Sequence, residues 1–195
     1  MGLYRELVDM HRERGNLEAL LDDEAFLLTV YETLRKWNMD QQGARLESFD
    51  IFMRSIKLWN DHLVKLYDYK LDEHIGEDIS KLKAILEMVF CNLNVMESKR
   101  RIVGVSKTLH FLLPDLIMPI DGKYTLPAFY GYNKFSNSPK KEFATFWEIF
   151  KETLEITERL ELNKNDVSGD GWNTSVPKLI DNAIIGLCLT ILKEN

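Results

Sequence analysis

The chain has 195 residues, a mass of 22.8 kDa, 45% hydrophobic residues and a formal net charge of −6. This length and hydrophobic content are sufficient for a folded core without disulfides or a structural metal, and they exclude a disordered chain. The negative charge argues against indiscriminate binding of nucleic acid, because affinity for phosphate comes from clustered Lys and Arg. We expect one globular domain over residues 1–195.

Hydrophobic residues recur at helical spacing along most of the chain, and no segment alternates in the manner of a β-strand. The spacing predicts helices over residues 2–14, 22–38, 46–68, 78–92, 139–160 and 176–193. The last of these is hydrophobic enough to be expected at the centre of the fold. The expected fold class is therefore all-α, with six or more helices in a compact domain or in two helical lobes.

The start of the chain shows no signal-peptide pattern, and no hydrophobic run is long enough to span a bilayer. Cys91 and Cys188 lie within hydrophobic helical patterns and are expected to be buried free thiols. These features predict a cytoplasmic protein that has no membrane partner. They say nothing about its oligomeric state.

The most distinctive segment covers residues 99–125 and has the sequence KRRIVGVSKTLHFLLPDLIMPIDGKYT. Gly104 lies between β-branched residues ahead of a helical run over 107–113, and it allows a sharp turn there. Ser106 is a suitable N-cap for that helix. The backbone amides of Gly104, Val105 and Ser106 would then form a cradle for a phosphate group.

Asp121 follows a hydrophobic run over 116–120, which is expected to be extended and buried because Pro119 disfavours a helical Met118. Its carboxyl group has two interpretations. It caps the next turn or helix, or it lies at the rim of a cleft with a perturbed pKa. His110, in contrast, is interpreted as a hydrogen-bonded core residue.

Basic residues concentrate between residues 99 and 141, where eight Lys and Arg residues against two Asp residues give a local charge of +6. The expected phosphate or nucleic-acid contacts among them are Arg100, Arg101, Lys107 and Lys123. Six aromatic residues in the same region either stack on bases or fill the core beneath a long irregular loop: Phe111, Tyr124, Phe129, Tyr130, Tyr132 and Phe135.

Several common functional motifs are absent from the sequence. It contains no GxxxxGK[ST], GxGxxG or GxSxG pattern, which are typical of nucleotide-binding proteins and hydrolases. It also contains no HExxH or CxxC pattern, and no histidine has partner ligands at metal spacing. The sequence therefore predicts no metal site and no cofactor.

Residues 100–125 resemble the helix-hairpin-helix DNA glycosylase superfamily, the group that includes endonuclease III and MutY. Val103-Gly104-Val105-Ser106 is similar to the hairpin turn of that family, and Met118-Pro119-Ile120-Asp121-Gly122 is similar to the segment that carries its aspartate. The resemblance implies a glycosylase-like helical core and DNA as a partner. It also implies that Asp121 is the catalytic carboxylate, which supports an oxocarbenium-like sugar or activates the nucleophile.

Two positions differ from the family pattern. Ser106 stands where the family has its second glycine, and Lys107 is one residue before the family's lysine, about 100° away around a helix. This difference favours a glycosylase without a lysine nucleophile, or a binder without catalysis. The leading hypothesis is a nucleic-acid- or phosphate-binding protein with a glycosylase-like core. The alternative is a non-enzymatic helical module for protein interaction or structure, so the sequence leaves open whether the chain is an enzyme.

Overall fold

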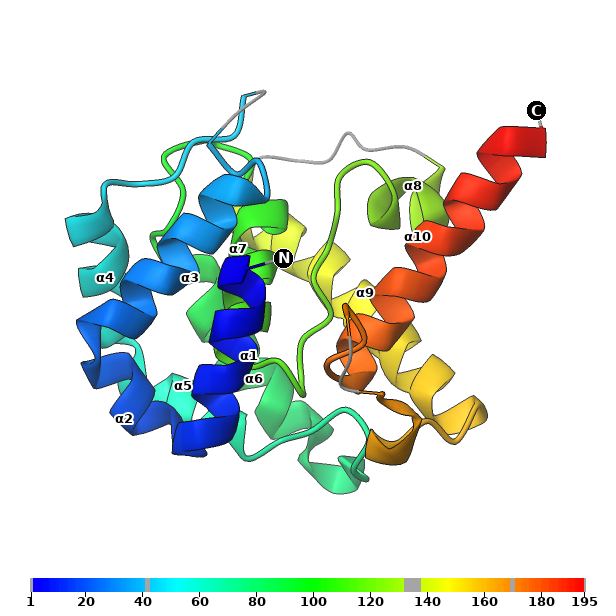
Figure 1. Cartoon of the computed structure of the whole chain (residues 1–195), viewed down its shortest axis with the longest axis horizontal. Helices are drawn as coiled ribbons and strands as arrows, with labels where there is room; N and C mark the ends of the chain where they lie inside the picture. The colour runs from blue at the N-terminus through cyan, green and yellow to red at the C-terminus, as the bar shows by residue number, and fades with distance from the viewer. Residues whose placement is uncertain (1, 41–42, 132–137, 169–170, 195) are drawn as a thin grey trace.

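The computed structural model of the chain describes residues 2–40, 43–131, 138–168 and 171–194 (Figure 1). Over these ranges the chain forms α-helices and two 3-10 helices but no β-strand, and one isolated bridge joins Leu46 to Met96. The all-α prediction is confirmed. None of the described helices combines the length and the hydrophobicity needed to cross a membrane.

The first five helices form one lobe. They are α1 (Gly2–Arg14), α2 (Leu17–Asp22), α3 (Glu24–Lys36), α4 (Phe49–Leu58) and α5 (Asn60–Tyr67). The helix expected over 46–68 is in fact two helices, because the backbone leaves helical geometry at Trp59 (φ −105°, ψ 13°). Helix α3 begins after Asp23, whose side chain accepts a hydrogen bond from the Ala25 amide and caps the helix.

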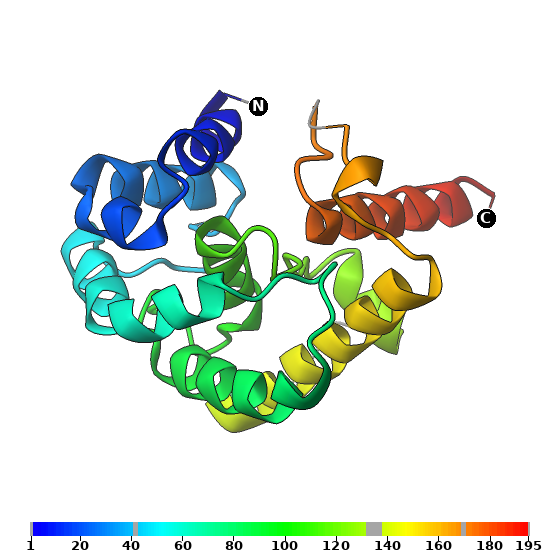
Figure 2. The same cartoon turned by 90° about the horizontal axis from the view of Figure 1, so that it is seen from below.

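The remaining elements form the second lobe and the connection to it. They are η1 (Gly76–Asp78), α6 (Ile79–Asn92), α7 (Ile102–Leu112), α8 (Thr125–Tyr130), α9 (Pro139–Arg159), η2 (Lys164–Asp166) and α10 (Val176–Glu194). Helix α9 packs against α6, α7 and α10, and α8 packs against α10. Figure 2 shows α1 at the upper left and α10 at the right, with α7 between the two lobes.

Helix α7 is the centre of the core. All of its residues except Val103 are buried, and its buried hydrophobic residues belong to a cluster that extends from Tyr4 in α1 to Ile180 in α10. His110 is fully buried within α7, and its Nδ1 atom lies 2.7 Å from the Ile117 carbonyl oxygen. Because a carbonyl only accepts, Nδ1 carries the proton and donates it. The prediction of a packed core histidine is therefore confirmed.

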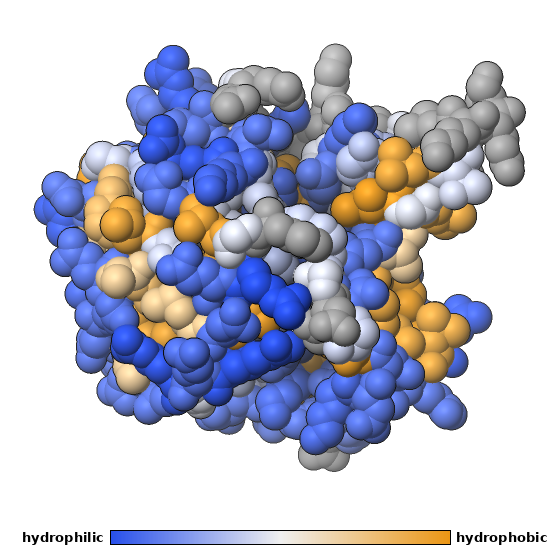
Figure 3. Space-filling model, in the orientation of Figure 1, coloured by the Kyte–Doolittle hydropathy of each residue, from blue (hydrophilic) through white to orange (hydrophobic). Residues whose placement is uncertain are grey.

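Helix α10 does not take the central position that its composition predicts. Only its first two turns are buried, while Leu187 and Leu189 are 63% and 42% exposed. Figure 3 shows hydrophobic residues at the surface along this helix. The prediction of a central helix is therefore wrong, because the second lobe covers α10 on one side only. Both cysteines are free, as expected, but each is half-buried rather than buried.

Candidate functional site

Two adjacent cavities lie beside α7, between the lobes. The first, with a volume of about 350 Å³, is here called the aromatic pocket, and its main lining residues are Trp37, Lys107, Asp121, Trp172, Lys178 and Asp181. The second, of about 800 Å³, is called the basic groove, and its main lining residues are Trp37, Arg100, Lys107, Asp121, Lys123 and Tyr124. Both volumes are in the range of small-molecule sites. The cavities meet at Trp37, Lys107 and Asp121.

Asp121 caps a turn, as the first interpretation expects, and it also lines both cavities. Its Oδ1 atom accepts hydrogen bonds from the amides of Lys123 (2.7 Å) and Tyr124 (3.2 Å), just before α8. Its Oδ2 atom lies 3.3 Å from the Lys107 Nζ atom. The Asp121 side chain is 30% exposed and lines both cavities.

Lys107 presents a desolvated amine where the two cavities meet. Its side chain is only 7% exposed, and its Nζ atom lies 5.6 Å from the centre of the Trp37 ring. Burial lowers the pKa of Lys107, Asp121 opposes this change, and the positive charge of Lys178 adds to it. A lysine with a lowered pKa in a cavity is a typical feature of functional sites.

A second ion pair on the opposite wall escaped the sequence analysis. Lys178 and Asp181, at i and i+3 on α10, are 6% and 4% exposed and directly paired. Burial raises the pKa of Asp181, and Lys178 opposes this change. The available signal was the presence of two charges within the hydrophobic helix over 176–193, since charged side chains are seldom buried unless they are paired.

Two tryptophans enclose the Lys178 ammonium group. Its Nζ atom lies 5.2 Å from the centre of the Trp37 ring and 5.8 Å from that of Trp172. These distances are within the range of cation–π attraction. Trp37 is the C-cap residue of α3, and its half-buried side chain lines the pocket.

Tyr4 connects the first lobe to the loop that carries Trp172. The Tyr4 ring stacks on Trp172 with ring centres 5.3 Å apart, and its hydroxyl oxygen lies 2.6 Å from Thr174 Oγ1. Behind Tyr4, the Nε2 atom of His110 lies 3.4 Å from the same hydroxyl. Burial raises the pKa of Tyr4 to about 12, so the phenol keeps its proton. The edge of the aromatic pocket is thus supported by α1 and α7.

The phosphate cradle expected from Gly104, Val105 and Ser106 is not formed. Helix α7 begins at Ile102, five residues earlier than predicted, so these three residues lie inside the helix. The Val105 amide donates to the Arg101 carbonyl, which satisfies it within the helix. The Ser106 hydroxyl is not a cap, since it accepts the Ile120 amide (3.1 Å) and holds the extended segment against α7.

The beginning of α7 is occupied by a carboxyl group of the chain itself. The buried Glu142 side chain, from α9, accepts a hydrogen bond of 3.0 Å from the Arg101 amide. This is the place where a helix favours an anion. Gly104 has a packing role instead, because a Cβ atom at this position would overlap the Met96 side chain.

The basic residues predicted to bind phosphate have different environments. The Arg101 guanidinium donates to the carbonyls of Phe90, Cys91 and Leu93, so it caps the end of α6 rather than facing a ligand. Arg100 and Lys123, in contrast, are exposed and line the basic groove together with Lys107 and Asp121.

The six predicted aromatic residues divide in a similar way. Phe111 is buried in the core, and Tyr124 lines the basic groove. Phe129 and Tyr130 are half-buried against the core, and they lie on α8, where the sequence predicted an irregular loop. Tyr132 and Phe135 lie outside the described residues.

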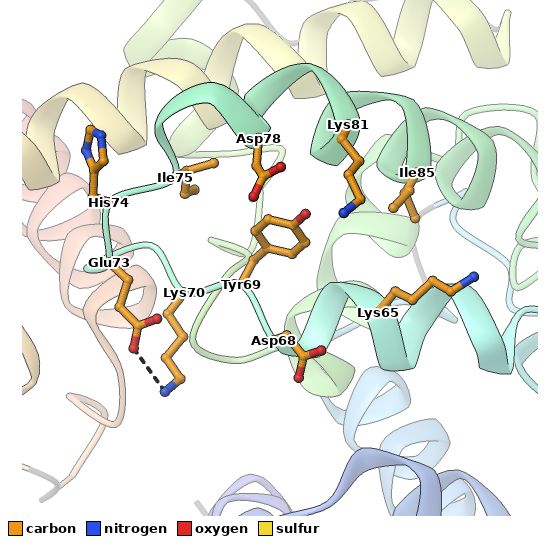
Figure 4. A pocket seen from close by; sticks show the side chains of 10 residues that line it. All are labelled: Lys65, Asp68, Tyr69, Lys70, Glu73, His74, Ile75, Asp78, Lys81 and Ile85. Atoms are coloured by element: carbon orange, nitrogen blue, oxygen red, sulfur yellow. Dashed lines mark hydrogen bonds and ion pairs between the residues drawn. The ribbon is translucent and has the colours of Figure 1, made fainter.

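A third cavity, of about 620 Å³, lies between α5, η1 and α6 (Figure 4). Lys65, Lys70 and Lys81 line it together with carboxylates, and Lys70 pairs with Glu73 at 3.2 Å. These charged side chains are half-buried or exposed, in contrast to Lys107 and Lys178. We therefore place the candidate site at the aromatic pocket and the basic groove.

In the part of the chain that the structure describes, no three His, Cys, Asp or Glu side chains are grouped so as to hold a metal ion. Comparison with protein families, curated proteins and solved structures finds no match for this chain. The geometry and charge of the site are therefore the basis for inferring its function.

Proposed function

We propose that the basic groove binds nucleic acid, with Arg100 and Lys123 as contacts to phosphate. The observation that carries this proposal is the charge of the site. Among the residues that the structure describes, four cations and two carboxylates line the two connected cavities, on a chain whose net charge is −6. The cations are Arg100, Lys107, Lys123 and Lys178. Local positive charge of this kind attracts a phosphate backbone.

The aromatic residues of the groove support a single-stranded or locally unpaired segment. Trp37 and Tyr124 line the same groove as the basic side chains, and both residues are half-buried. Aromatic rings next to Lys and Arg form the usual platform on which unpaired bases stack. Lys123 Nζ lies 5.0 Å from the centre of the Tyr124 ring, so a phosphate contact and a stacking surface are adjacent.

A binding assay across a salt series tests this function. The wild-type chain is expected to bind labelled oligonucleotide with an affinity that falls as salt rises, because binding releases counterions. The double substitution Arg100→Glu/Lys123→Glu is expected to weaken binding and to reduce the salt slope by about 2, one for each lost contact. Arg54→Glu/Lys57→Glu on α4 is the matched control, with the same charge change at exposed positions of the first lobe.

Two results would count against nucleic-acid binding. One is the absence of binding even at low salt, and the other is an equal loss of affinity in the groove and control variants. Either result favours the alternative of a helical interaction or structural module.

The resemblance to DNA glycosylases supports a second candidate function, which is release of a base from DNA. The specific observation is that the partly exposed Asp121 side chain lines both cavities, with its Oδ2 atom 3.3 Å from the desolvated Lys107 amine. A carboxylate in this position would stabilise positive charge that develops on a sugar ring.

Base release from lesion-bearing DNA tests this second candidate. Asp121→Asn retains an oxygen that accepts the amides of Lys123 and Tyr124, but it removes the negative charge. A catalytic Asp121 predicts a loss of activity of at least 100-fold with oligonucleotide affinity unchanged within about twofold. Equal release by both proteins would remove Asp121 from the mechanism, and no release by the wild-type chain would leave the groove as a binding site only.

A further inference from the structure

We propose that the aromatic pocket is a binding site for an oxyanion, either a phosphate monoester or a carboxylate, held between the ammonium groups of Lys107 and Lys178. This site does not require that nucleic acid binds in the basic groove. Its ligand is a small organic acid or the phosphorylated end of a nucleic-acid strand, since both present the same group.

Two buried cations, Lys107 and Lys178, line the same pocket. Both side chains are more than nine-tenths buried, both line the cavity of about 350 Å³, and both Nζ atoms lie within 6 Å of one ring centre, that of Trp37, at 5.6 and 5.2 Å. Two ammonium groups taken out of water repel each other and lose hydration. An anion between them would relieve both costs.

The two ammonium groups have more N–H donors than the aspartates beside them accept. Each ammonium group has three N–H donors. Within the described residues, Lys107 uses one of them for Asp121 and Lys178 uses one for Asp181. The neighbouring indole rings attract the positive charge but supply no oxygen to accept the remaining donors. A ligand that carries several acceptor oxygens would satisfy them.

Each of the two buried lysines is paired with a carboxylate of the chain, which reduces the cost of burying its charge. Asp121 and Asp181 each neutralise one lysine, and Asp181 is almost completely buried in doing so. Asp121 Oδ1 is already occupied by the amides of Lys123 and Tyr124. The aspartates therefore compensate the positive charges of the two lysines. The N–H donors that the aspartates do not accept are available to a ligand.

The remaining walls indicate what is attached to the oxyanion. Pro119, Ile185 and the partly exposed Trp172 ring supply hydrophobic surface next to the lysines. A cavity of about 350 Å³ has room for more than an isolated phosphate ion. A flat organic body that stacks on Trp172, with its oxyanion directed towards Lys107 and Lys178, satisfies both parts of the pocket.

Titration of the full chain with phenyl phosphate and with benzoate tests the site. Binding is expected to be saturable, to change the fluorescence of Trp37 and Trp172, and to be visible by calorimetry. The double substitution Lys178→Gln/Asp181→Asn removes the cation without leaving a charged partner in the core. It is expected to weaken binding at least tenfold, the effect of losing one charge-assisted hydrogen bond.

Two further variants separate recognition from folding. Asp181→Asn alone keeps Lys178 and is expected to bind both acids at least as tightly as the wild-type chain. Lys57→Gln, at an exposed position of α4 outside both cavities, is expected to change affinity less than twofold. The proposal is overturned if neither acid binds to the folded wild-type chain, or if the Lys178→Gln/Asp181→Asn variant binds as tightly as the wild type.

A pair of oligonucleotides identifies the source of the oxyanion. A strand with a 5′-phosphate that binds at least tenfold tighter than its 5′-hydroxyl counterpart, with the preference lost in the Lys178→Gln/Asp181→Asn variant, assigns the site to a strand end. No such preference, with phenyl phosphate or benzoate bound, assigns it to a free organic acid. If Arg100→Glu/Lys123→Glu leaves oligonucleotide affinity unchanged while the acids still bind, the proposed function fails and the oxyanion site stands.

Discussion

Two lysine–aspartate pairs face the same pocket but are built in different ways. The Lys107–Asp121 pair joins residues 14 positions apart, from α7 and an extended segment, and its carboxylate is 30% exposed. The Lys178–Asp181 pair lies within α10 at i and i+3, and both of its side chains are almost completely buried. The first pair depends on the fold for its formation, whereas the second depends on the fold only for its burial.

This difference assigns different tasks to the two carboxylates. Asp121 retains access to solvent and to a ligand, so its charge can act on a reacting group at moderate cost in stability. Asp181 has little such access, and its main effect is to compensate the buried charge of Lys178. Substitutions in the two pairs should therefore separate effects on activity from effects on stability.

His110 is fully buried behind Tyr4, and its titration is expected to have the largest effect on the free energy of unfolding. Burial, followed by the charge of Lys178, lowers its pKa to about 3. The folded state therefore resists protonation, and stability that is complete above the unfolded pKa of about 6.5 is lost as the pH falls towards 3, by up to about 5 kcal/mol. Urea unfolding at pH 7 and at pH 4 measures this loss.

The His110→Gln substitution is the test of that assignment. Glutamine can still donate a hydrogen bond to the Ile117 carbonyl but does not titrate. The free energy of unfolding of this variant should change less between pH 7 and pH 4 than that of the wild type. An unchanged slope would show that His110 is not responsible.

Asp181→Ala should have the next largest effect, because it leaves the Lys178 charge buried without its partner. We expect the free energy of unfolding to fall by about 3–5 kcal/mol. Glu148→Ala is the matched control, since Glu148 also pairs with a lysine three residues away, Lys151, but at the surface. That control should lose less than about 1 kcal/mol. Similar losses in both variants, measured by urea unfolding, would contradict the assigned burial of Asp181.

Asp121→Asn should cost less stability than Asp181→Ala although it belongs to the same pocket. The asparagine oxygen can still accept the amides that Asp121 caps, and Lys107 loses only a partly exposed partner. We expect a loss of about 1–2 kcal/mol by urea unfolding. A loss as large as that of Asp181→Ala would indicate that the two pairs are equally structural.

Tyr4→Phe should have the smallest effect, because it keeps the ring and removes only the hydroxyl, which contacts Thr174 and, at the longer distance of 3.4 Å, His110. The ring can still stack on Trp172, while the hydrogen bond with Thr174 is lost. The expected loss in the free energy of unfolding is about 1 kcal/mol. The tryptophan fluorescence of the variant should show that Trp172 is more exposed than in the wild type. An unchanged spectrum would argue that the Tyr4 hydroxyl does not hold the loop that carries Trp172 and Thr174.

Much of the fold could be predicted because helices depend on local patterns. The periodicity over 2–14, 78–92 and 139–160 predicted α1, α6 and α9 closely. Residues 117–120 lie outside any helix, as the proline at 119 predicts, although Leu116 still belongs to the turn that follows α7. The errors occur where a distant contact overrides local preference. Glu142 holds the start of α7 at Ile102, and Gly104 packs against Met96 instead of turning the chain.

The sequence alone predicted that this chain is helical, that its region over 99–141 is basic, and that Asp121 could lie at the rim of a cleft. Each of these depends on neighbouring residues or on composition. Only the tertiary structure decided that Lys178, Asp181 and Trp172 face Lys107 and Trp37, because these residues come from distant parts of the chain. Tertiary packing also set their degree of burial, and burial in low dielectric gives a charged pair its energetic weight.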